Sequence, residues 1–312
     1  MSSYLVTGGA GFIGSNICRR LVNEGHSVKV IDNLLTGKKS NLDDIIDKID
    51  FIEGDMGDVE LSKAAMKDVD VVFHQGALPS VPKSVDDPAA THKHCVDATF
   101  NVLLAARDSG VKRVVYAASS SAYGDSERLP KVEDMVTNPL SPYAVGKLVG
   151  EYYCKVFSEV FGLETIALRY FNVFGPYQDP TSQYAAAIPA FVTSILKGTP
   201  PTIYGDGEQS RDFTYIDNVV EANMCAANAE KTQGEVVNIA CGDRITVNEI
   251  IKMINSITGQ NVEPEYAPRR AGDVKHSHAD ISKAKEVIGF EPVCEFREGL
   301  DKAIDWYRDN LM

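Results

Sequence analysis

The chain has 312 residues, of which 44% are hydrophobic and 24% charged, and its formal net charge is −13. The length favours about two domains, and the composition suffices for a buried core. The negative charge argues against a nucleic-acid partner, because phosphates would be repelled by the average field. The first predicted strand begins near residue 4, and no apolar run is long enough to span a bilayer, so we expect a soluble cytoplasmic protein without a signal peptide. The six cysteines form no CxxC pair, which favours buried, reduced thiols over disulfides or a metal site.

A glycine-rich turn follows the first predicted strand. A β-prone run at 4–7 leads into Gly8-Gly9-Ala10-Gly11-Phe12-Ile13-Gly14, and the apolar spacing beyond it predicts a helix over 12–24. This order is typical of dinucleotide-binding sites. Gly8 would permit the tight turn, Gly11 would let the backbone approach a pyrophosphate, and Gly14 would let the helix pack close to the sheet.

The second predicted strand, 28–32, ends in Asp32. A carboxylate at this place can accept hydrogen bonds from both ribose hydroxyls and repels a 2′-phosphate. The sequence therefore favours NAD over NADP, although Lys38 and Lys39 follow closely and partly offset that preference.

Strands and helices alternate over the first 170 residues, as a doubly wound parallel sheet requires. Two further segments lie at predicted strand ends, the edge where open α/β sheets bind ligands. In the segment 54–56, Asp55 can accept a hydrogen bond from an adenine amino group and Met56 can pack on the ring. In the segment 75–77, the small residues would let the backbone come close to the cofactor. Strands are predicted near 4–7, 28–32, 50–53, 70–74, 112–118 and 164–169, and helices near 12–24, 59–68, 88–109 and 142–161.

Two polar clusters follow the fifth strand. The serines of 119–121 would face the same crevice as the helix that starts in Ser141-Pro142-Tyr143-Ala144-Val145-Gly146-Lys147. Ser141 suits the N-cap and Pro142 the first helical position, which puts Tyr143 and Lys147 on one face, one turn apart. Because a free tyrosine has a pKa near 10, it needs a nearby cation to act as a base, and Lys147 and a nicotinamide ring are candidates.

The second half is less regular, with several prolines after Asn172. Arg211 and Arg270 are candidate diphosphate ligands, because the guanidinium fork offers paired donors. A strand at 236–239 is expected to rejoin the main sheet, with helices near 246–257 and 282–288. The fold class expected is therefore α/β, a Rossmann-type doubly wound parallel sheet with a smaller mixed α/β lobe. Residues 1–171 with about 213–245 would form the NAD-binding domain, and 172–212 with 246–312 the substrate-binding lobe.

Together these motifs resemble the extended short-chain dehydrogenase/reductases, and specifically the UDP-sugar 4-epimerases that act on UDP-glucose or UDP-N-acetylglucosamine. The resemblance covers essentially the whole chain and also rests on the segments 168–176, 203–207, 211–213 and 270–273. It implies an NAD-dependent isomerase whose catalytic residues are Ser119, Tyr143 and Lys147. It implies NAD contacts, besides Tyr143 and Lys147, from Gly8, Gly11, Phe12, Ile13, Gly14, Asp32, Asn33, Gly37, Asp55, Met56, Gln75, Gly76, Ala77 and Tyr170.

The resemblance also implies a sugar-nucleotide site and no metal. Its residues would be Ser80, Ser120, Ser121, Asn172, Ala186, Ile188, Tyr204, Arg211, Arg270, Asp273 and Ser277. Family members restricted to plain hexoses often carry a tyrosine in place of Ser277, so a small residue implies room for a 2-acetamido group. UDP-GlcNAc and UDP-GalNAc are then expected to be accepted as well as UDP-glucose and UDP-galactose.

The implied reaction is inversion at C4: Tyr143 removes the proton of the 4-hydroxyl, hydride leaves for NAD, and a 4-keto sugar turns before the hydride returns. Ser120 and Ser121 stand where dehydratases of the superfamily carry an Asp-Glu pair, which disfavours dehydration. A UDP-glucuronate epimerase, a decarboxylase and a sugar reductase remain alternatives. A non-catalytic NAD-sensing regulator would have lost Tyr143 or Lys147, and this chain keeps both.

The chain departs from the family pattern at Cys95 and Ala98, where asparagine and glycine are usual, and at Gly76, where alanine is usual. The first two changes remove an amide that helps to position the strand bearing the serines and a glycine that eases packing. The resemblance finally implies a homodimer, formed through a four-helix bundle of the helices near 88–109 and 142–161.

Overall fold

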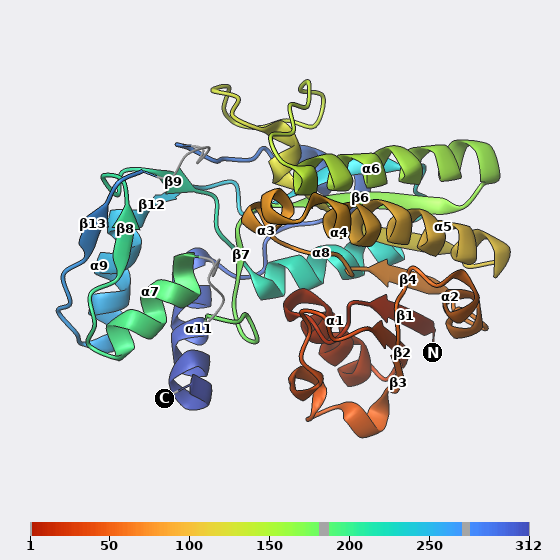
Figure 1. The fold of residues 1–312 in the computed structure, drawn as a ribbon, viewed down its shortest axis with the longest axis horizontal. Coiled ribbons are helices and arrows are strands. Elements are labelled where there is room, and N and C mark those ends of the chain that lie inside the picture. The colour runs from red at the N-terminus through yellow and green to blue at the C-terminus, as the bar shows by residue number, and fades with distance from the viewer. Residues whose placement is uncertain (1, 181–186, 270–274, 312) are drawn as a thin grey trace.

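A seven-stranded parallel sheet with helices on both faces forms the centre of the molecule (Figure 1). The computed structural model describes residues 2–180, 187–269 and 275–311. The strand order is β11-β6-β5-β4-β1-β2-β3, and every neighbouring pair is parallel. The Rossmann-type sheet is thus confirmed. Its strands are β1 (Ser3–Thr7), β2 (Ser27–Asp32), β3 (Asp50–Glu53), β4 (Val71–His74), β5 (Arg113–Ser119), β6 (Glu164–Tyr170) and β11 (Glu235–Ile239).

The chain order reverses between β1 and β4. From β1 the sheet extends to β2 and β3 on one side and to β4, β5, β6 and β11 on the other. Such a reversal leaves a crevice beyond the carboxyl ends of the two central strands, where open α/β sheets bind ligands. The pairing of β11 with β6 confirms that the strand predicted at 236–239 returns to the main sheet.

Each face of the sheet is covered by its own layer of helices. Helices α1 (Phe12–Asn23) and α8 (Ile216–Asn228) pack together on one face, and α2 (Val59–Ala65), α5 (Ala98–Asp108) and α6 (Pro142–Phe161) on the other (Figure 1). Side chains alternate between the two cores, as strand geometry requires. Val6 joins the core that contains Ile17 of α1, and Leu5 joins the one that contains Leu103 of α5.

The helix predicted over 88–109 is interrupted. It consists of α4 (Pro88–His92), a π-helical turn (Lys93–Asp97) and α5, and a short α3 (Val81–Asp86) precedes it. A π turn widens the helix by one residue per turn and so changes which side chains share a face. Its presence was not predicted, because apolar spacing does not distinguish one widened turn from a regular helix.

The smaller lobe is built from short strand pairs and helices. The parallel pairs are β7 (Val173–Phe174) with β10 (Thr214–Tyr215) and β8 (Thr202–Tyr204) with β13 (Glu265–Ala267), and β9 (Ser210–Arg211) is antiparallel to β12 (Ile245–Thr246). Its helices are α7 (Ala187–Leu196), α9 (Val247–Thr258) and α11 (Phe296–Leu311), whereas α10 (Ser282–Ile288) packs against β11 and α8. Helices α9 and α10 were predicted. Helices α7, α8 and α11 were not. Three 3-10 segments, Lys39–Leu42, Ile46–Lys48 and Ser120–Tyr123, complete the elements.

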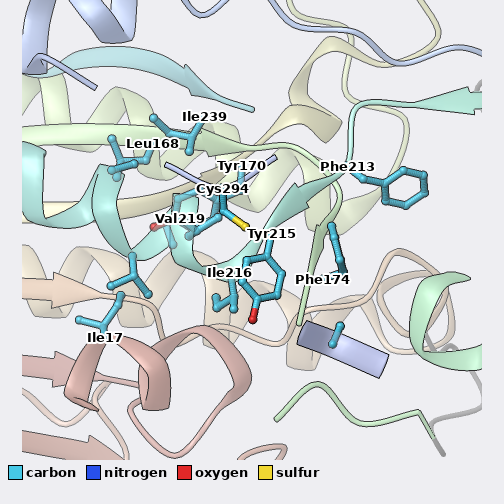
Figure 2. Close-up of a cluster of buried hydrophobic side chains, with 14 of the residues drawn as sticks. Ile17, Leu168, Tyr170, Phe174, Phe213, Tyr215, Ile216, Val219, Ile239 and Cys294 are labelled. Atoms are coloured by element: carbon cyan, nitrogen blue, oxygen red, sulfur yellow. The ribbon is translucent and has the colours of Figure 1, made fainter. Parts of the chain in front are cut away.

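One hydrophobic core joins the main sheet to the smaller lobe. Figure 2 shows it running from Ile17 and Leu168 at the sheet to Phe174 and Phe213 near the short strands. The rings of Phe213 and Phe296 lie tilted against each other with their centroids 5.9 Å apart, which brings α11 into the same cluster. The lobes therefore hold their relative positions through buried apolar contacts.

Two sequence-level expectations bear on the cellular setting. No described helix has both the length and the apolar content that crossing a bilayer would require. All six cysteines are free thiols, and Cys18, Cys95, Cys154 and Cys294 are buried, as predicted.

Candidate active site

A cleft opens at the carboxyl ends of β1, β2 and β4, where the chain order reverses. Most of the predicted cofactor residues line it: Gly8, Gly11, Phe12, Ile13, Gly14, Asp32, Asn33, Gly37, Met56, Gln75, Gly76 and Ala77. The remaining lining residues were not predicted as cofactor contacts: Ile31, Leu35, Thr36, Gly54, Pro79 and His94. Leu35 and Thr36 could have been found, because they directly follow the strand end that carries Asp32. His94 could not, because the π turn decides where it points.

Glycines make the floor of this cleft. Gly8 has a φ of +68°, and a Cβ there would lie 2.6 Å from the Cα of Gly76. A Cβ on Gly14 would lie 2.3 Å from the carbonyl oxygen of Gly8. Only glycine fits either position. The bare backbone in front of the N-terminus of α1 matches the shape and charge that a dinucleotide diphosphate needs.

Asp32 is held rigidly at the edge of the cleft. Its Oδ2 accepts a hydrogen bond from the Ala10 N–H (2.9 Å), and its Oδ1 accepts one from the Leu34 N–H (2.8 Å). Burial raises the pKa of the Asp32 carboxyl, and the two backbone hydrogen bonds oppose that rise. Each oxygen keeps a further lone pair, so the carboxylate can still accept ribose hydroxyls.

The two predicted residues that follow β3, Asp55 and Met56, are placed differently. Met56 lines the cleft, and a Cβ on Gly76 would lie 2.2 Å from its sulfur. Asp55 is not among the lining residues, and its Oδ1 accepts a hydrogen bond from Gly57 N–H at 2.9 Å. The contact between Asp55 and an adenine amino group therefore stays a prediction.

Helix α6 begins as predicted. The Ser141 Oγ accepts a hydrogen bond from the Ala144 N–H (3.1 Å), and Pro142 occupies the first turn. Lys147 is buried, and its Nζ donates to the carbonyl oxygen of Ala117 at 2.7 Å. The same Nζ lies 6.0 Å from the centre of the Tyr143 ring. The two predicted catalytic side chains thus share one face of the helix, next to β5.

The environment of Tyr143 favours its neutral phenol. Burial raises the Tyr143 pKa to about 12, nearby Cys95 adds to the rise, and a hydrogen bond with Ser119 opposes it. Burial also lowers the pKa of Lys147. Lys147 at this distance does not offset the desolvation of the phenol. Two cations are candidates for the charge that favours the phenolate, Lys147 and the nicotinamide ring. Of these, only the nicotinamide ring is left.

The predicted serines lie at the end of β5. The Ser119 Oγ accepts hydrogen bonds from the Ser121 hydroxyl (2.8 Å) and the Ser121 N–H (3.2 Å). Its own proton is therefore left to donate toward Tyr143 or a ligand. Ser120 is half-buried in the 3-10 turn that follows.

Tyr170 belongs to a buried amide cluster behind the cleft. Its hydroxyl accepts hydrogen bonds from Gln75 Nε2 (3.2 Å) and Asn223 Nδ2 (2.9 Å). Gln75 lines the cleft, so Tyr170 positions a residue that faces the cofactor site. Asn223 was missed, because its helix α8 was not predicted. Asn172 lies two residues beyond β6, at a φ of +21°, and its Nδ2 donates to the Asp212 carbonyl oxygen at 3.1 Å.

Two of the predicted substrate residues meet in the smaller lobe. The Arg211 Nη1 donates to the carbonyl oxygens of Ser210 and Lys275, each at 3.0 Å. The Ser277 N–H donates to the same Ser210 carbonyl at 3.0 Å. Tyr204 ends β8 with 37% of its surface exposed.

The other predicted substrate residues are placed less directly. Ile188 is buried in the main core, so its contact with a substrate stays a prediction. The Ser80 Oγ caps α3 by accepting the Lys83 N–H at 3.2 Å. Ala186, Arg270 and Asp273 lie outside the described residues.

Asp212 holds the segment that carries Ser277, a role that was not predicted for it. Its buried carboxylate accepts N–H bonds from Cys241 (3.0 Å) and Ala279 (3.2 Å). Burial raises the Asp212 pKa to about 6. Because the folded pKa lies above the ordinary value of 3.8, the protonated form is favoured in the folded chain, and this contribution to stability is lost as the pH rises through 6.

Comparison with known proteins shows the family of the chain. A family model described as the NAD dependent epimerase/dehydratase family matches residues 4–240. A putative UDP-glucose 4-epimerase of Methanocaldococcus jannaschii is 40% identical over 98% of both chains. A UDP-glucuronate 4-epimerase of Thermodesulfobacterium geofontis is 33% identical, over 100% of this chain and 98% of its own.

Solved structures are similar over the whole chain. The UDP-N-acetylglucosamine 4-epimerase of Methanobrevibacter ruminantium, in complex with UDP-N-acetylmuramic acid, superposes with a TM-score of 0.95 at 40% identity, covering 99% of each chain. A UDP-glucose 4-epimerase of Thermotoga maritima, solved with UDP-glucose, gives 0.94 at 38% identity, covering 99% of this chain and 100% of its own.

The site predicts how Tyr143 titrates. In cofactor-free protein, we expect the tyrosinate absorbance lost on Tyr143→Phe substitution to appear only near pH 12. With NAD⁺ added, the same difference should shift down by about 1 to 3 pH units, because a cation next to a buried phenol favours its ionised form. The measurement is an ultraviolet pH titration of the wild type minus the variant. Tyr266→Phe, at an exposed tyrosine, is the control whose difference should not respond to NAD⁺. Ionisation of Tyr143 near neutral pH without cofactor would contradict this account.

Proposed function

Because this chain belongs to the NAD dependent epimerase/dehydratase family, we propose that it inverts the C4 configuration of UDP-sugars through a transient 4-keto intermediate. One observation carries the proposal: half-buried Tyr143 shares a face of α6 with buried Lys147 and bonds to Ser119 at the end of β5, the strand next to β4, whose end lines the glycine-floored cleft. A proton-transfer group next to a dinucleotide site is the arrangement that alcohol oxidation requires.

The chain's own residues have distinct parts in this reaction. Tyr143 takes the proton of the 4-hydroxyl and later returns it, and Ser119 donates a hydrogen bond from its free hydroxyl proton. Lys147, anchored on Ala117, keeps further N–H groups for a ribose hydroxyl. Bound NAD supplies a hydride acceptor at C4 and a hydride donor to the opposite face. Arg211 anchors the diphosphate while the hexose stays free to turn.

We propose the same division of labour between the lobes as the sequence suggests. Residues 1–171 with about 213–245 would bind NAD, and 172–212 with 246–312 would bind the UDP-sugar. The pairing of β11 with β6 and the packing of α8 on the sheet support the assignment of the inserted segment to the cofactor side.

Inversion at C4 is the direct test. UDP-glucose and UDP-GlcNAc, incubated separately with the protein and without added NAD, should each give the C4 epimer when followed by NMR. Tyr143→Phe should lower the rate by about 10²- to 10⁴-fold, because the proton-transfer group is lost. Tyr152→Phe, at an exposed tyrosine of the same helix, should leave the rate unchanged. The proposal would be contradicted by undiminished turnover in Tyr143→Phe, or by net formation of a reduced or decarboxylated sugar.

We further propose that the preferred sugar carries a 2-acetamido group. Ser277 is half-buried, and its N–H and the Arg211 guanidinium both donate to the Ser210 carbonyl, which supports a place for this small residue close to a diphosphate held by Arg211. The names of similar proteins include UDP-glucose, UDP-N-acetylglucosamine and UDP-glucuronate epimerases, so a uronic acid is the alternative outcome.

Substitution at Ser277 tests this specificity. Ser277→Tyr should raise the KM for UDP-GlcNAc by about tenfold or more relative to UDP-glucose, because overpacking a site for one group costs about 1–3 kcal/mol. Ser277→Ala keeps the space and should preserve the preference. Equal effects of Ser277→Tyr on both substrates, or a wild type that turns over only UDP-glucuronate, would refute the acetamido preference.

We also propose that two copies pair through the exposed faces of α5 and α6. Tyr152, Val156 and Val160 recur four residues apart on α6, and their side chains, together with Phe100 and Phe161, are exposed in the single chain. An apolar helical stripe of this kind is expected to be covered by a partner, and a second copy would give a four-helix bundle.

Sedimentation equilibrium tests the pairing. The wild type should have twice the 34.0 kDa mass of the chain. Val156→Glu should shift it to the single-chain mass at micromolar concentration, because an unpaired charge would be buried at the contact. Val136→Glu, the same change at a more exposed valine of a loop, should remain dimeric. A monomeric wild type, or a Val156→Glu variant that stays dimeric, would exclude this interface.

A further inference from the structure

A buried chain of hydrogen bonds connects the floor of the cleft to the turn beneath the catalytic helix. Gly76 N–H donates to the Thr7 hydroxyl at 3.3 Å, and Thr7 Oγ1 lies 2.8 Å from His74 Nδ1. On the other side, His74 Nε2 lies 3.0 Å from Thr99 Oγ1, which donates to the Cys95 carbonyl oxygen at 2.8 Å. Thr7, His74 and Thr99 are all buried.

The donors and acceptors of these side chains allow only one direction for the hydrogen bonds. Since Thr99 donates its only hydroxyl proton to Cys95, it must accept from His74 Nε2–H. Burial, with the nearby charge of Lys147 as a second cause, lowers the His74 pKa to about 3, so the ring is neutral at physiological pH and its Nδ1 carries no proton. Nδ1 therefore accepts from Thr7, whose oxygen in turn accepts from Gly76 N–H. Every donor in the chain has one acceptor.

Both ends of the chain touch functional parts of the site. Gly76 lines the cleft and packs against Gly8. Cys95 lies in the π turn, directly against α6: a Cβ on Gly146 would lie 2.9 Å from the Cβ of Cys95. The same turn carries His94 into the cleft lining. The position of this turn therefore bears on both the cofactor site and the helix that holds Tyr143 and Lys147.

We propose that His74 is a positioning residue that couples the cofactor floor at Gly76 to the π turn at Cys95 through Thr7 and Thr99. The catalytic part of this inference rests on the proposed function, whereas the part that concerns NAD does not. The competing explanation is that the two threonines make separate local bonds that stabilise the fold and nothing more. The two explanations differ at Thr99, which does not line the cleft.

Near-isosteric removal of each hydroxyl separates them. NAD⁺ binding to cofactor-stripped, full-length protein is measured by titration calorimetry for Thr7→Val, Thr99→Val and the double variant. We expect each single variant to weaken NAD⁺ binding about fivefold to tenfold, and the double variant to weaken it by less than the product of the two. Thr7→Ser, which keeps the hydroxyl, should restore wild-type affinity.

The control is Thr91→Val. Thr91 is equally buried, and its hydroxyl likewise bonds the carbonyl four residues earlier, that of Asp87 at 3.0 Å, but it is not part of the chain. It should lower thermal stability as Thr99→Val does and leave NAD⁺ affinity unchanged.

The turnover readout adds a second signature. In Thr99→Val, kcat for UDP-GlcNAc should fall at saturating NAD⁺ while its KM changes by less than about twofold, because no contact in the smaller lobe is altered. Unchanged NAD⁺ affinity in Thr99→Val, or single effects that simply multiply in the double variant, would overturn the proposal. A wild type that binds NAD⁺ but inverts no UDP-sugar would refute the proposed function alone, and the calorimetric comparison would still decide the role of His74.

Discussion

The hydrogen bond from Lys147 to the carbonyl of Ala117 fixes the geometry on which the rest of the site depends. A buried ammonium is costly unless its protons are bonded, so α6 can pack on β5 only where this carbonyl is in reach.

Two further contacts along α6 restrict the position of the helix. The Tyr116 hydroxyl donates to the Lys147 carbonyl at 3.2 Å, in a space that exists only because position 150 is glycine. The bidentate ion pair of Glu151 with Arg169 ties the next turn to β6. Tyr143 is placed against Ser119 as a consequence.

The same burial that fixes these groups also sets their charge. Desolvation raises the pKa of Tyr143 and lowers that of Lys147, so the protein alone holds both groups closer to neutrality than water would. On the proposed function, Tyr143 would therefore act as a base when a positive charge is added at the cleft. This dependence would protect the site from unproductive proton transfer in the absence of cofactor.

One hydrophobic core spans the main sheet and the smaller lobe. The core that begins at Ile17 continues to Phe213 and Phe296, and the segment from 275 to 279 is bonded both to β9 and to buried Asp212. A substrate held by that segment would therefore be presented to β5 and α6 at a defined distance.

The sequence by itself determined the glycine turn, the strand ends that carry ligand-facing residues, and the start of α6 at Ser141 and Pro142. These features depend on local rules: φ values open only to glycine, capping, and the alternation of buried strands. It could not place α8, whose inward face carries the buried Asn218 and Asn223 and so lacks a simple apolar stripe. Three other features were decided only by the tertiary structure: the π turn at Cys95, the Asp212 contacts and the hydrogen-bond chain through His74. The π turn alters a helix by a single residue, and the other two join residues that are distant in sequence. Contacts of this kind leave no periodic pattern in the sequence. They are favourable because they give a buried polar group a hydrogen-bond partner, and that partner can come from any part of the folded chain.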